Sequence, residues 1–310
     1  MHDAPALTDL ITELGTLTTE HFDPDRGDLD LISTQQLVAA MNAEDARVAA
    51  AVADRSIEIT AAVDAIVDRM RRGGRLIYLG AGTAGRMGVL DASECPPTFG
   101  TDPSLIIGLI AGGASAIHTA VEGAEDDLDA AGIELADLGL DADDVVVGVS
   151  ASGRTPYVIG GLTAARARGA LTIAVACNAP SAIGAVADIP IEVVVGPEFV
   201  AGSTRLKAGT AQKLVLNMLT TPSLIRLGQT YRGVRGGLRA TNETLRARSI
   251  RTVAVMADAT LDAAADALDR TDGAVKQAIL VLSTGIPAEA AAAAIAAADG
   301  MLARAIADQG

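Results

Sequence analysis

Five short apolar runs, each followed by a loop of small and polar residues, constrain the fold of this 310-residue chain more than any other feature. Each run is nearly continuous in Ile, Val and Leu, without the polar–apolar alternation of a half-exposed strand. The runs occupy residues 75–80, 105–113, 144–153, 171–178 and 189–196. Because helical segments separate them, the sequence predicts an α/β fold with a doubly wound, parallel, five-stranded sheet covered on both faces.

The regions that flank the predicted sheet have helical patterns. Residues 1–65 are predicted to form an N-terminal helical segment, and residues 66–229 the sheet domain. Residues 230–310 are predicted to form a helical connector and a small C-terminal unit of three helices. Three helices are expected because the Ala-rich tail is interrupted by turn-forming residues at 271–273 and 285–287.

The composition excludes several classes of protein. The chain carries 39 acidic and 24 basic residues, for a net charge of −15, which argues against nucleic acid or an anionic membrane as partner. The two cysteines and three histidines do not have the spacing of metal ligands, so no metal site is expected. The N-terminal residues lack the cations of an export signal, and no stretch is typical of a membrane helix. We therefore expect a cytoplasmic protein.

Three loops at predicted carboxyl ends of strands, or beside them, combine glycines, hydroxyls and cations. Ligands of doubly wound sheets bind at that edge, where glycines permit close approach and helix N-termini offer free N–H groups. The predicted anion-binding residues are Gly82, Thr83, Ala84, Gly85 and Arg86, then Ser150, Ser152, Gly153 and Thr155, and finally Ser203, Thr204 and Lys207. Any one loop alone also fits a turn with ordinary helix caps. Together they favour a phosphate site.

The first of these loops also fits a dinucleotide motif. Gly80, Gly82 and Gly85 satisfy G-x-G-x-x-G between a strand and a helix. A dinucleotide site also needs an acid at the end of the second strand, which here ends in Ala111-Gly112-Gly113. The nucleotide interpretation is therefore disfavoured.

Two glutamates are candidates for acid–base chemistry. Glu94 stands beside Cys95 and two prolines in DASECPPTFG, in an otherwise apolar run, where desolvation would raise its pKa. Glu125 lies in AVEGAEDD, whose composition alone is typical of a solvated helical face.

These segments, taken together and in this order, resemble the N-acetylmuramic acid 6-phosphate etherase family, whose members carry a sugar isomerase (SIS) domain. The resemblance covers most of the chain. It rests on RLIYLGAGTAGRMGVLDASECPPTFG, AVEGAEDD, VVVGVSASGRTPYV and GSTRLKAGTAQKLVLNMLTT, with Thr19-Glu20 upstream. Ala84 departs from the pattern, because the family usually has Ser there.

The resemblance implies cleavage of the D-lactyl ether at C3 of N-acetylmuramic acid 6-phosphate. The implied route is elimination of D-lactate followed by addition of water, with no metal or organic cofactor. By motif position, Glu94 matches the family's proton donor and Glu125 its second catalytic acid, which we assign to removal of the C2 proton. The resemblance also implies a homodimer with its site near the subunit interface, and a role in amino-sugar metabolism or cell-wall recycling.

Two other functions remain open at this point. One is a non-catalytic sugar-phosphate-sensing regulator, as in the related glucokinase regulatory protein. The other is a sugar-phosphate isomerase of the SIS type. The two acidic motifs favour the etherase over the isomerase. Regulators of this kind carry two SIS domains, whereas this chain has room for one.

Overall fold

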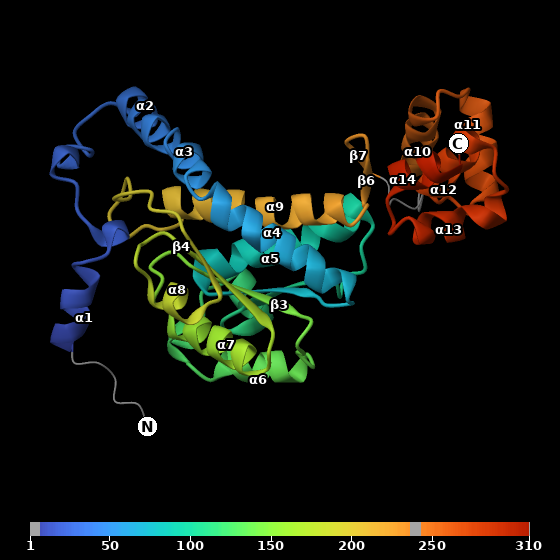
Figure 1. The fold of residues 1–310 in the computed structure, drawn as a ribbon. Helices are drawn as coiled ribbons and strands as arrows, with labels where there is room; N and C mark the ends of the chain where they lie inside the picture. The colour runs from blue at the N-terminus through green and yellow to red at the C-terminus, as the bar shows by residue number, and fades with distance from the viewer. Residues whose placement is uncertain (1–6, 236–242, 310) are drawn as a thin grey trace. The chain divides into compact units, whose positions relative to one another are not determined.

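A computed structural model, which describes residues 7–235 and 243–309, contains a five-stranded, all-parallel sheet with the order β2-β1-β3-β4-β5 (Figure 1). The strands are β1 (Leu76–Gly80), β2 (Ile106–Ile110), β3 (Val145–Ser150), β4 (Leu171–Ala176) and β5 (Ile189–Glu192). Every residue of β1 and β3 is buried, as their uninterrupted apolar sequences require. The predicted fold class is confirmed.

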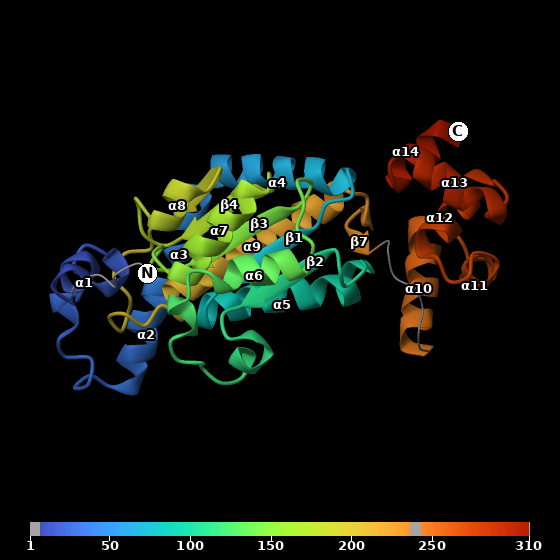
Figure 2. The same ribbon diagram turned by 90° about the horizontal axis from the view of Figure 1, so that it is seen from below.

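Helices cover both faces of this sheet. On one face lie α4 (Ser56–Arg71), α5 (Gly82–Phe99) and α9 (Lys207–Arg226), and on the other α6 (Ala130–Asp137), α7 (Pro156–Ala167) and α8 (Ala182–Val186) (Figures 1 and 2). The core under α6 and α7 contains Leu79, Val146 and Leu162, each fully buried. Short 3₁₀ helices, η3 (Gly113–Ile117) and η4 (Ala124–Asp126), occupy the connection between β2 and α6.

The segment before the sheet is helical, as predicted, but broken. It contains α1 (Leu7–Leu14), η1 (Thr18–Glu20), η2 (Pro24–Arg26), α2 (Thr34–Asp45) and α3 (Val48–Ala53). Ser33 and Gln36 form a reciprocal capping box that starts α2. Glu44 of α2 pairs with the buried Lys207 of α9 at 2.7 Å and with Arg26 at 2.9 Å. The predicted N-terminal segment is thus part of the same compact unit as the sheet, which comprises residues 1–92 and 106–220.

A second compact unit comprises residues 93–105 and 221–310. It contains β6 (Thr230–Tyr231), β7 (Val234–Arg235), α10 (Glu243–Met256), α11 (Leu261–Arg270), α12 (Val275–Thr284), α13 (Ala288–Ala297) and α14 (Leu302–Gln309). Over the described residues to 309, four helices therefore follow α10 where the sequence predicted three. The additional break falls at Asp299 and Gly300, which have φ angles of +55° and +76°. Part of the predicted connector, 236–242, lies outside the described residues.

The apolar character of the C-terminal helices comes from packing within their own unit. Val253, Leu268, Ile279 and Leu302 are at most 1% exposed and form one core. Within the described ranges, no single helix is long and apolar enough to cross a bilayer, and α12 with α13 meets that description only as a pair bent by 103°.

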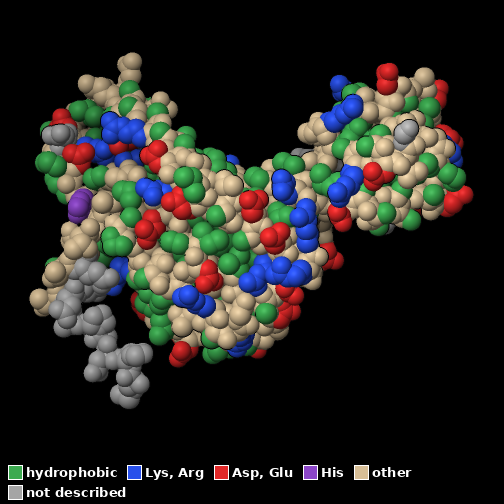
Figure 3. Space-filling model, viewed as in Figure 1, with side chains coloured by type: hydrophobic (Ala, Val, Ile, Leu, Met, Phe, Trp, Pro, Cys, Tyr) green, Lys and Arg blue, Asp and Glu red, His purple; other side chains and the backbone are tan. Residues whose placement is uncertain are grey.

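Charged side chains of both signs share the surface. Arg72 pairs with Asp143 at 2.6 Å, and Arg166 with Asp188 at 3.3 Å. Figure 3 shows acidic side chains interspersed with basic ones on the face drawn. Isolated exposed pairs of this kind contribute at most about 1 kcal/mol each.

The ion pair of Arg75 with Asp144 is buried on the carboxylate side and should contribute more. Asp144 is 1% exposed and accepts from the Arg75 amide at 2.8 Å, from Nη2 at 2.6 Å and from the Asp141 amide at 3.1 Å. Burial opposes ionisation, but the hydrogen bonds and charge of Arg75 hold the pKa of Asp144 below its ordinary value. Asp144→Asn should therefore lower the free energy of unfolding by about 1.5–3 kcal/mol at pH 7.

The pH dependence of this effect follows from the direction of the pKa shift. Because the folded-state pKa lies below the unfolded one, the carboxylate stabilises the fold above about pH 4, and this contribution is lost as the pH falls through the folded-state pKa. Urea unfolding at a series of pH values measures the difference between wild type and variant. A difference that persists unchanged in strong acid would contradict this assignment.

Candidate functional site

The turn from β1 to α5 is built so that only glycine fits at two positions. A Cβ on Gly80 would lie 2.6 Å from the Gly85 nitrogen, and a Cβ on Gly85 would lie 2.6 Å from Ile110 Cγ1. The first turn of α5 is therefore packed directly on the ends of β1 and β2. Its N-terminus, with Gly82 and Thr83, is at the carboxyl edge of the sheet, where a helix dipole favours an anion.

The turn from β3 to α7, residues 150–155, is called the serine loop here and gathers three hydroxyl groups. Ser150 Oγ lies 2.8 Å from Thr155 Oγ1 and 3.3 Å from Ser152 Oγ, and it accepts from the Gly153 amide at 3.1 Å. Gly153 has a φ of +76°, and a Cβ there would lie 2.5 Å from Ser181 Cβ. Pro156 begins α7 with a pre-set φ. The loop thus presents hydroxyls beside a helix N-terminus in one fixed conformation.

The start of α9 differs from the other two helix starts because a side chain already caps it. Glu198, 1% exposed, accepts from the Lys207 amide at 3.0 Å and from the Ala208 amide at 2.9 Å. The Lys207 ammonium is 3% exposed and donates to Glu44. These two amides and the ammonium are therefore engaged within the protein.

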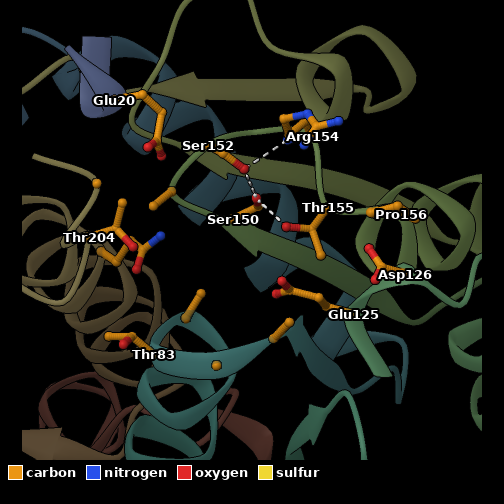
Figure 4. Close-up of a pocket in the computed structure, with 16 residues that line it drawn as sticks. Glu20, Thr83, Glu125, Asp126, Ser150, Ser152, Arg154, Thr155, Pro156 and Thr204 are labelled. Atoms are coloured by element: carbon orange, nitrogen blue, oxygen red, sulfur yellow. Dashed lines mark hydrogen bonds between the residues drawn. The ribbon is translucent and has the colours of Figure 1, made fainter. Parts of the chain in front are cut away.

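A cavity of about 240 Å³ lies among these loops (Figure 4). Its lining residues are Glu20, Ala81, Gly82, Thr83, Ala84, Glu125, Asp126, Ser150, Ala151, Ser152, Arg154, Thr155, Pro156, Gly202, Thr204 and Gln212. In Figure 4, Ser150, Ser152 and Thr155 face one another, and the carboxylates of Glu20 and Glu125 point toward the cavity from separate elements.

The structure brings together eight of the fourteen residues predicted for the site. Those that line the cavity are Gly82, Thr83, Ala84, Ser150, Ser152, Thr155, Thr204 and Glu125. Gly85 and Gly153 do not line it but shape the turns that do. Ser203 and Lys207 also lie outside the lining set. The predicted loops are thus placed around one cavity, although not every predicted side chain faces it.

Arg86 lines a second, adjoining cavity of about 160 Å³, which shares Gly82 and Glu125 with the first. Its Nε donates to the carbonyl of Ile117 at 2.9 Å, and its Nη2 donates to Ala116 at 2.8 Å. These bonds tie α5 to η3, in the connection that also carries Glu125. In this structure Arg86 therefore holds the loop that carries Glu125.

Glu94 is the one predicted acid that does not line either cavity. It stands near the C-terminal end of α5 with an exposed side chain, so the desolvation that its sequence neighbours predicted is not found in the single chain. Among the described residues, no group of three His, Cys, Asp or Glu side chains has the arrangement of a metal site.

Four polar lining residues were not predicted: Glu20, Asp126, Arg154 and Gln212. Two of these residues had a partial signal in the sequence, since Thr19-Glu20 belongs to the resembling segments and Arg154 lies inside the serine loop. Asp126 follows Glu125 directly. Gln212, inside α9, also lies in a resembling segment, GSTRLKAGTAQKLVLNMLTT, but no motif of glycines, hydroxyls or charges marked it as a lining residue.

Glu20 reaches the cavity because Asn178 holds the segment that carries it. Asn178 Oδ1 accepts from the Thr18 amide at 2.8 Å, while its Nδ2 donates to Thr19 Oγ1 and to the Ala151 carbonyl, both at 3.0 Å. Asn178 is 3% exposed and follows β4. One amide thus ties η1 to the serine loop.

The side chains that line the cavity carry more negative than positive charge. Three carboxylates, Glu20, Glu125 and Asp126, line it together with a single cation, Arg154, among the described lining side chains. An anionic ligand would therefore depend on backbone N–H groups and hydroxyls as much as on positive charge. The carboxylates can exchange protons with a bound ligand or accept from its hydroxyls.

Two family models each match part of the chain. The chain matches the SIS domain over residues 130–222 and the glucokinase regulatory protein N-terminal SIS domain over residues 58–166. A phosphoheptose isomerase from Neisseria gonorrhoeae is similar in structure, with a TM-score of 0.47, 20% identity, and coverage of 61% of this chain and 98% of that one.

Much higher identity is found among curated proteins. An N-acetylmuramic acid 6-phosphate etherase from Streptomyces avermitilis is 59% identical over 96% of both chains. One from Streptomyces coelicolor is 56% identical over 99% of both, and one from Mycolicibacterium smegmatis is 50% identical over 95% of this chain and 99% of that one. The resemblance drawn from the sequence motifs is confirmed, and the chain belongs to the N-acetylmuramic acid 6-phosphate etherase family.

Proposed function

We propose that this protein is a carbon–oxygen lyase that converts N-acetylmuramic acid 6-phosphate and water into N-acetylglucosamine 6-phosphate and D-lactate. The observation that carries the proposal is one cavity in which the hydroxyls of Ser150, Ser152 and Thr155 and the carboxylate of Glu125 are combined. Near-full-length identity of 56–59% to etherases supports the same substrate.

The serine loop is the proposed phosphate site. The hydroxyls of Ser150, Ser152 and Thr155 surround a point at the N-terminus of α7, where the dipole favours a dianion. Thr83, at the N-terminus of α5, faces the same cavity. Phosphate binding there fixes the sugar relative to Glu125.

The proposed reaction proceeds by elimination and hydration. Glu125 removes the C2 proton of the open-chain aldehyde, the C2–C3 double bond forms as the C3–O bond breaks, and Glu94 protonates the departing lactate oxygen. Water then adds across the double bond: Glu94 takes its proton as the hydroxyl bonds to C3, and Glu125 returns a proton to C2. Both glutamates regain their starting protonation states.

Because Glu94 does not line the cavity of its own chain, we propose that a second copy of the chain supplies it. Its side chain is exposed, and acid–base catalysis requires hydrogen-bond reach of the substrate. A symmetric homodimer would place the Glu94 of each copy at the site of the other. The dimer implied by the family resemblance is the simplest assembly that provides this.

We further propose that the enzyme acts in the cytoplasm. Neither Cys95 nor Cys177 forms a disulfide, and both are buried. Burial raises the pKa of the Cys177 thiol to about 12. Unreactive buried thiols are typical of proteins in a reducing compartment.

The decisive experiment is incubation with N-acetylmuramic acid 6-phosphate and an enzymatic assay for D-lactate, with N-acetylglucosamine 6-phosphate as the binding control. Lactate release supports the etherase. Binding of the control without lactate release would support the sensing regulator, and ketose formation without lactate would support the isomerase.

Loss of one hydroxyl from the phosphate site should weaken substrate binding. Thr155→Val removes a hydrogen-bond donor to the charged phosphate, and this loss should raise KM by about 10–150-fold. The value of kcat should change little, because the phosphate contact is present in both the ground state and the transition state. Thr163→Val is the matched control, since Thr163 lies on α7 but bonds to the Ile159 carbonyl and is exposed. Equal KM values for the two variants would remove Thr155 from the site.

A further inference from the structure

Gln212 is a buried amide without a partner in the described part of the chain. It lies on α9, is 1% exposed and lines the 240 Å³ cavity. Neither its Oε1 nor its Nε2 has a hydrogen-bond partner among the described residues, and both atoms are shielded from solvent. Few buried polar side chains in native proteins are left in this state, because each unpaired group opposes folding.

A structural role does not account for this side chain. The first backbone amides of α9 are capped by Glu198, so Gln212 is not needed to cap the helix. A methionine or leucine would fill the same volume without burying unpaired polar atoms. An amide that lines a ligand cavity and pairs with nothing within residues 7–235 and 243–309 is explained if the ligand supplies its partners.

The chemistry of the amide narrows the choice of partner. Among the described side chains that line the cavity, Gln212 alone carries both an N–H donor and a carbonyl acceptor on one rigid planar group. The ionised carboxylates of Glu20, Glu125 and Asp126 can only accept, and the hydroxyls of the serine loop are committed to the proposed phosphate site. The ligand group that can pair with both the donor and the acceptor of Gln212 is a second amide.

We propose that Gln212 recognises the acetamido group of the sugar, with Nε2 donating to its carbonyl oxygen and Oε1 accepting from its N–H. This inference rests on the proposed substrate class and assigns a specificity-determining residue within it. Gln212 would distinguish a 2-acetamido sugar phosphate from a sugar phosphate that bears a hydroxyl at C2. It would also hold C2, the carbon that loses its proton, in a fixed position.

The test is a thermodynamic cycle of Kd values in which one side chain of the protein and one group of the ligand are changed separately and together. Isothermal titration calorimetry measures the Kd of N-acetylglucosamine 6-phosphate and of glucose 6-phosphate for wild type, Gln212→Met and Thr155→Val. Gln212→Met should weaken binding of the acetamido sugar by about tenfold or more and leave glucose 6-phosphate within about twofold. Thr155→Val should weaken both sugars by the same factor.

Two further measurements keep the test decisive. Since Gln212→Met removes two unpaired buried groups, the Tm of the unliganded variant should equal or exceed that of wild type; a fall of several degrees would mean that the amide is paired within the protein and would overturn the inference. Gln212→Glu keeps the shape but loses the N–H donor, and it should also lose the preference for the acetamido sugar.

The inference and the proposed function fail separately. If wild type releases D-lactate but Gln212→Met weakens both sugars equally, or neither, then Gln212 does not read the acetamido group and the etherase activity stands. If wild type releases no lactate yet binds N-acetylglucosamine 6-phosphate, the lyase proposal fails, and the two Kd ratios still decide the role of Gln212.

Discussion

Glu125→Gln lowers the kcat for D-lactate release by about 10²–10⁴-fold, the usual effect of losing one acid–base group, while KM changes little. The substitution preserves the size and planarity of the side chain and removes its ability to take the C2 proton. Glu125 faces both cavities from η4. Loss of deuterium exchange at C2 of the product, followed by nuclear magnetic resonance, should accompany the loss of turnover.

Neighbouring acids provide matched controls for this prediction. Asp126→Asn removes a carboxylate that also lines the first cavity, and Glu122→Gln removes one that lines only the second. Both should retain kcat within about tenfold, because neither is assigned a proton in the reaction. If Glu125→Gln behaves like these two variants, another residue is the base, and Glu20, the remaining lining glutamate, becomes the first candidate.

Mixing two inactive variants restores activity if Glu94 acts across a dimer. Glu94→Gln and Glu125→Gln should each reduce kcat by about 10²–10⁴-fold alone. In a fully exchanged 1:1 mixture half of the dimers are mixed, and each mixed dimer has one site with both native glutamates. The mixture should therefore recover about one quarter of wild-type activity.

The control for this mixture is the double variant. In a fully exchanged 1:1 mixture of Glu94→Gln/Glu125→Gln chains with wild-type chains, a mixed dimer has no site with both native glutamates. Only the wild-type dimers, about one quarter of all dimers, should therefore be active. Size-exclusion chromatography with light scattering reports whether the copies are dimers. If mixing the single variants gives only the sum of their residual rates, both glutamates act within one chain, and the placement of Glu94 on a partner is wrong.

The fold could be predicted because its signals are local. Strands buried on both faces need uninterrupted apolar residues, and the glycine and serine turns that follow them are contiguous in sequence. The last helix was missed for the opposite reason. Asp299 and Gly300 break a run of small apolar residues through left-handed backbone angles, and an Ala-rich stretch with one Asp-Gly pair is also compatible with a continuing helix.

The candidate site was predictable only in part, because side-chain partners lie far apart in the sequence. Lys207 stands beside the third loop, which suggested a phosphate ligand, but Glu44 neutralises it from 163 residues away. Arg86, which was also predicted to bind the anion, instead donates to the carbonyls of Ala116 and Ile117. Gln212 is the reverse case: no motif in its sequence points to a ligand, and its significance arises from a buried amide that nothing in the described protein satisfies.

The bonds from Asn178 to Thr18 and Thr19 have a consequence for chimaeric enzymes. A graft that transfers only the sheet domain, starting at residue 66, would carry the serine loop and Asn178 but leave behind the wall formed by Glu20. To exchange specificity between relatives, residues 18–20 and the loop that follows β3 must therefore be transferred together, as one recombination block.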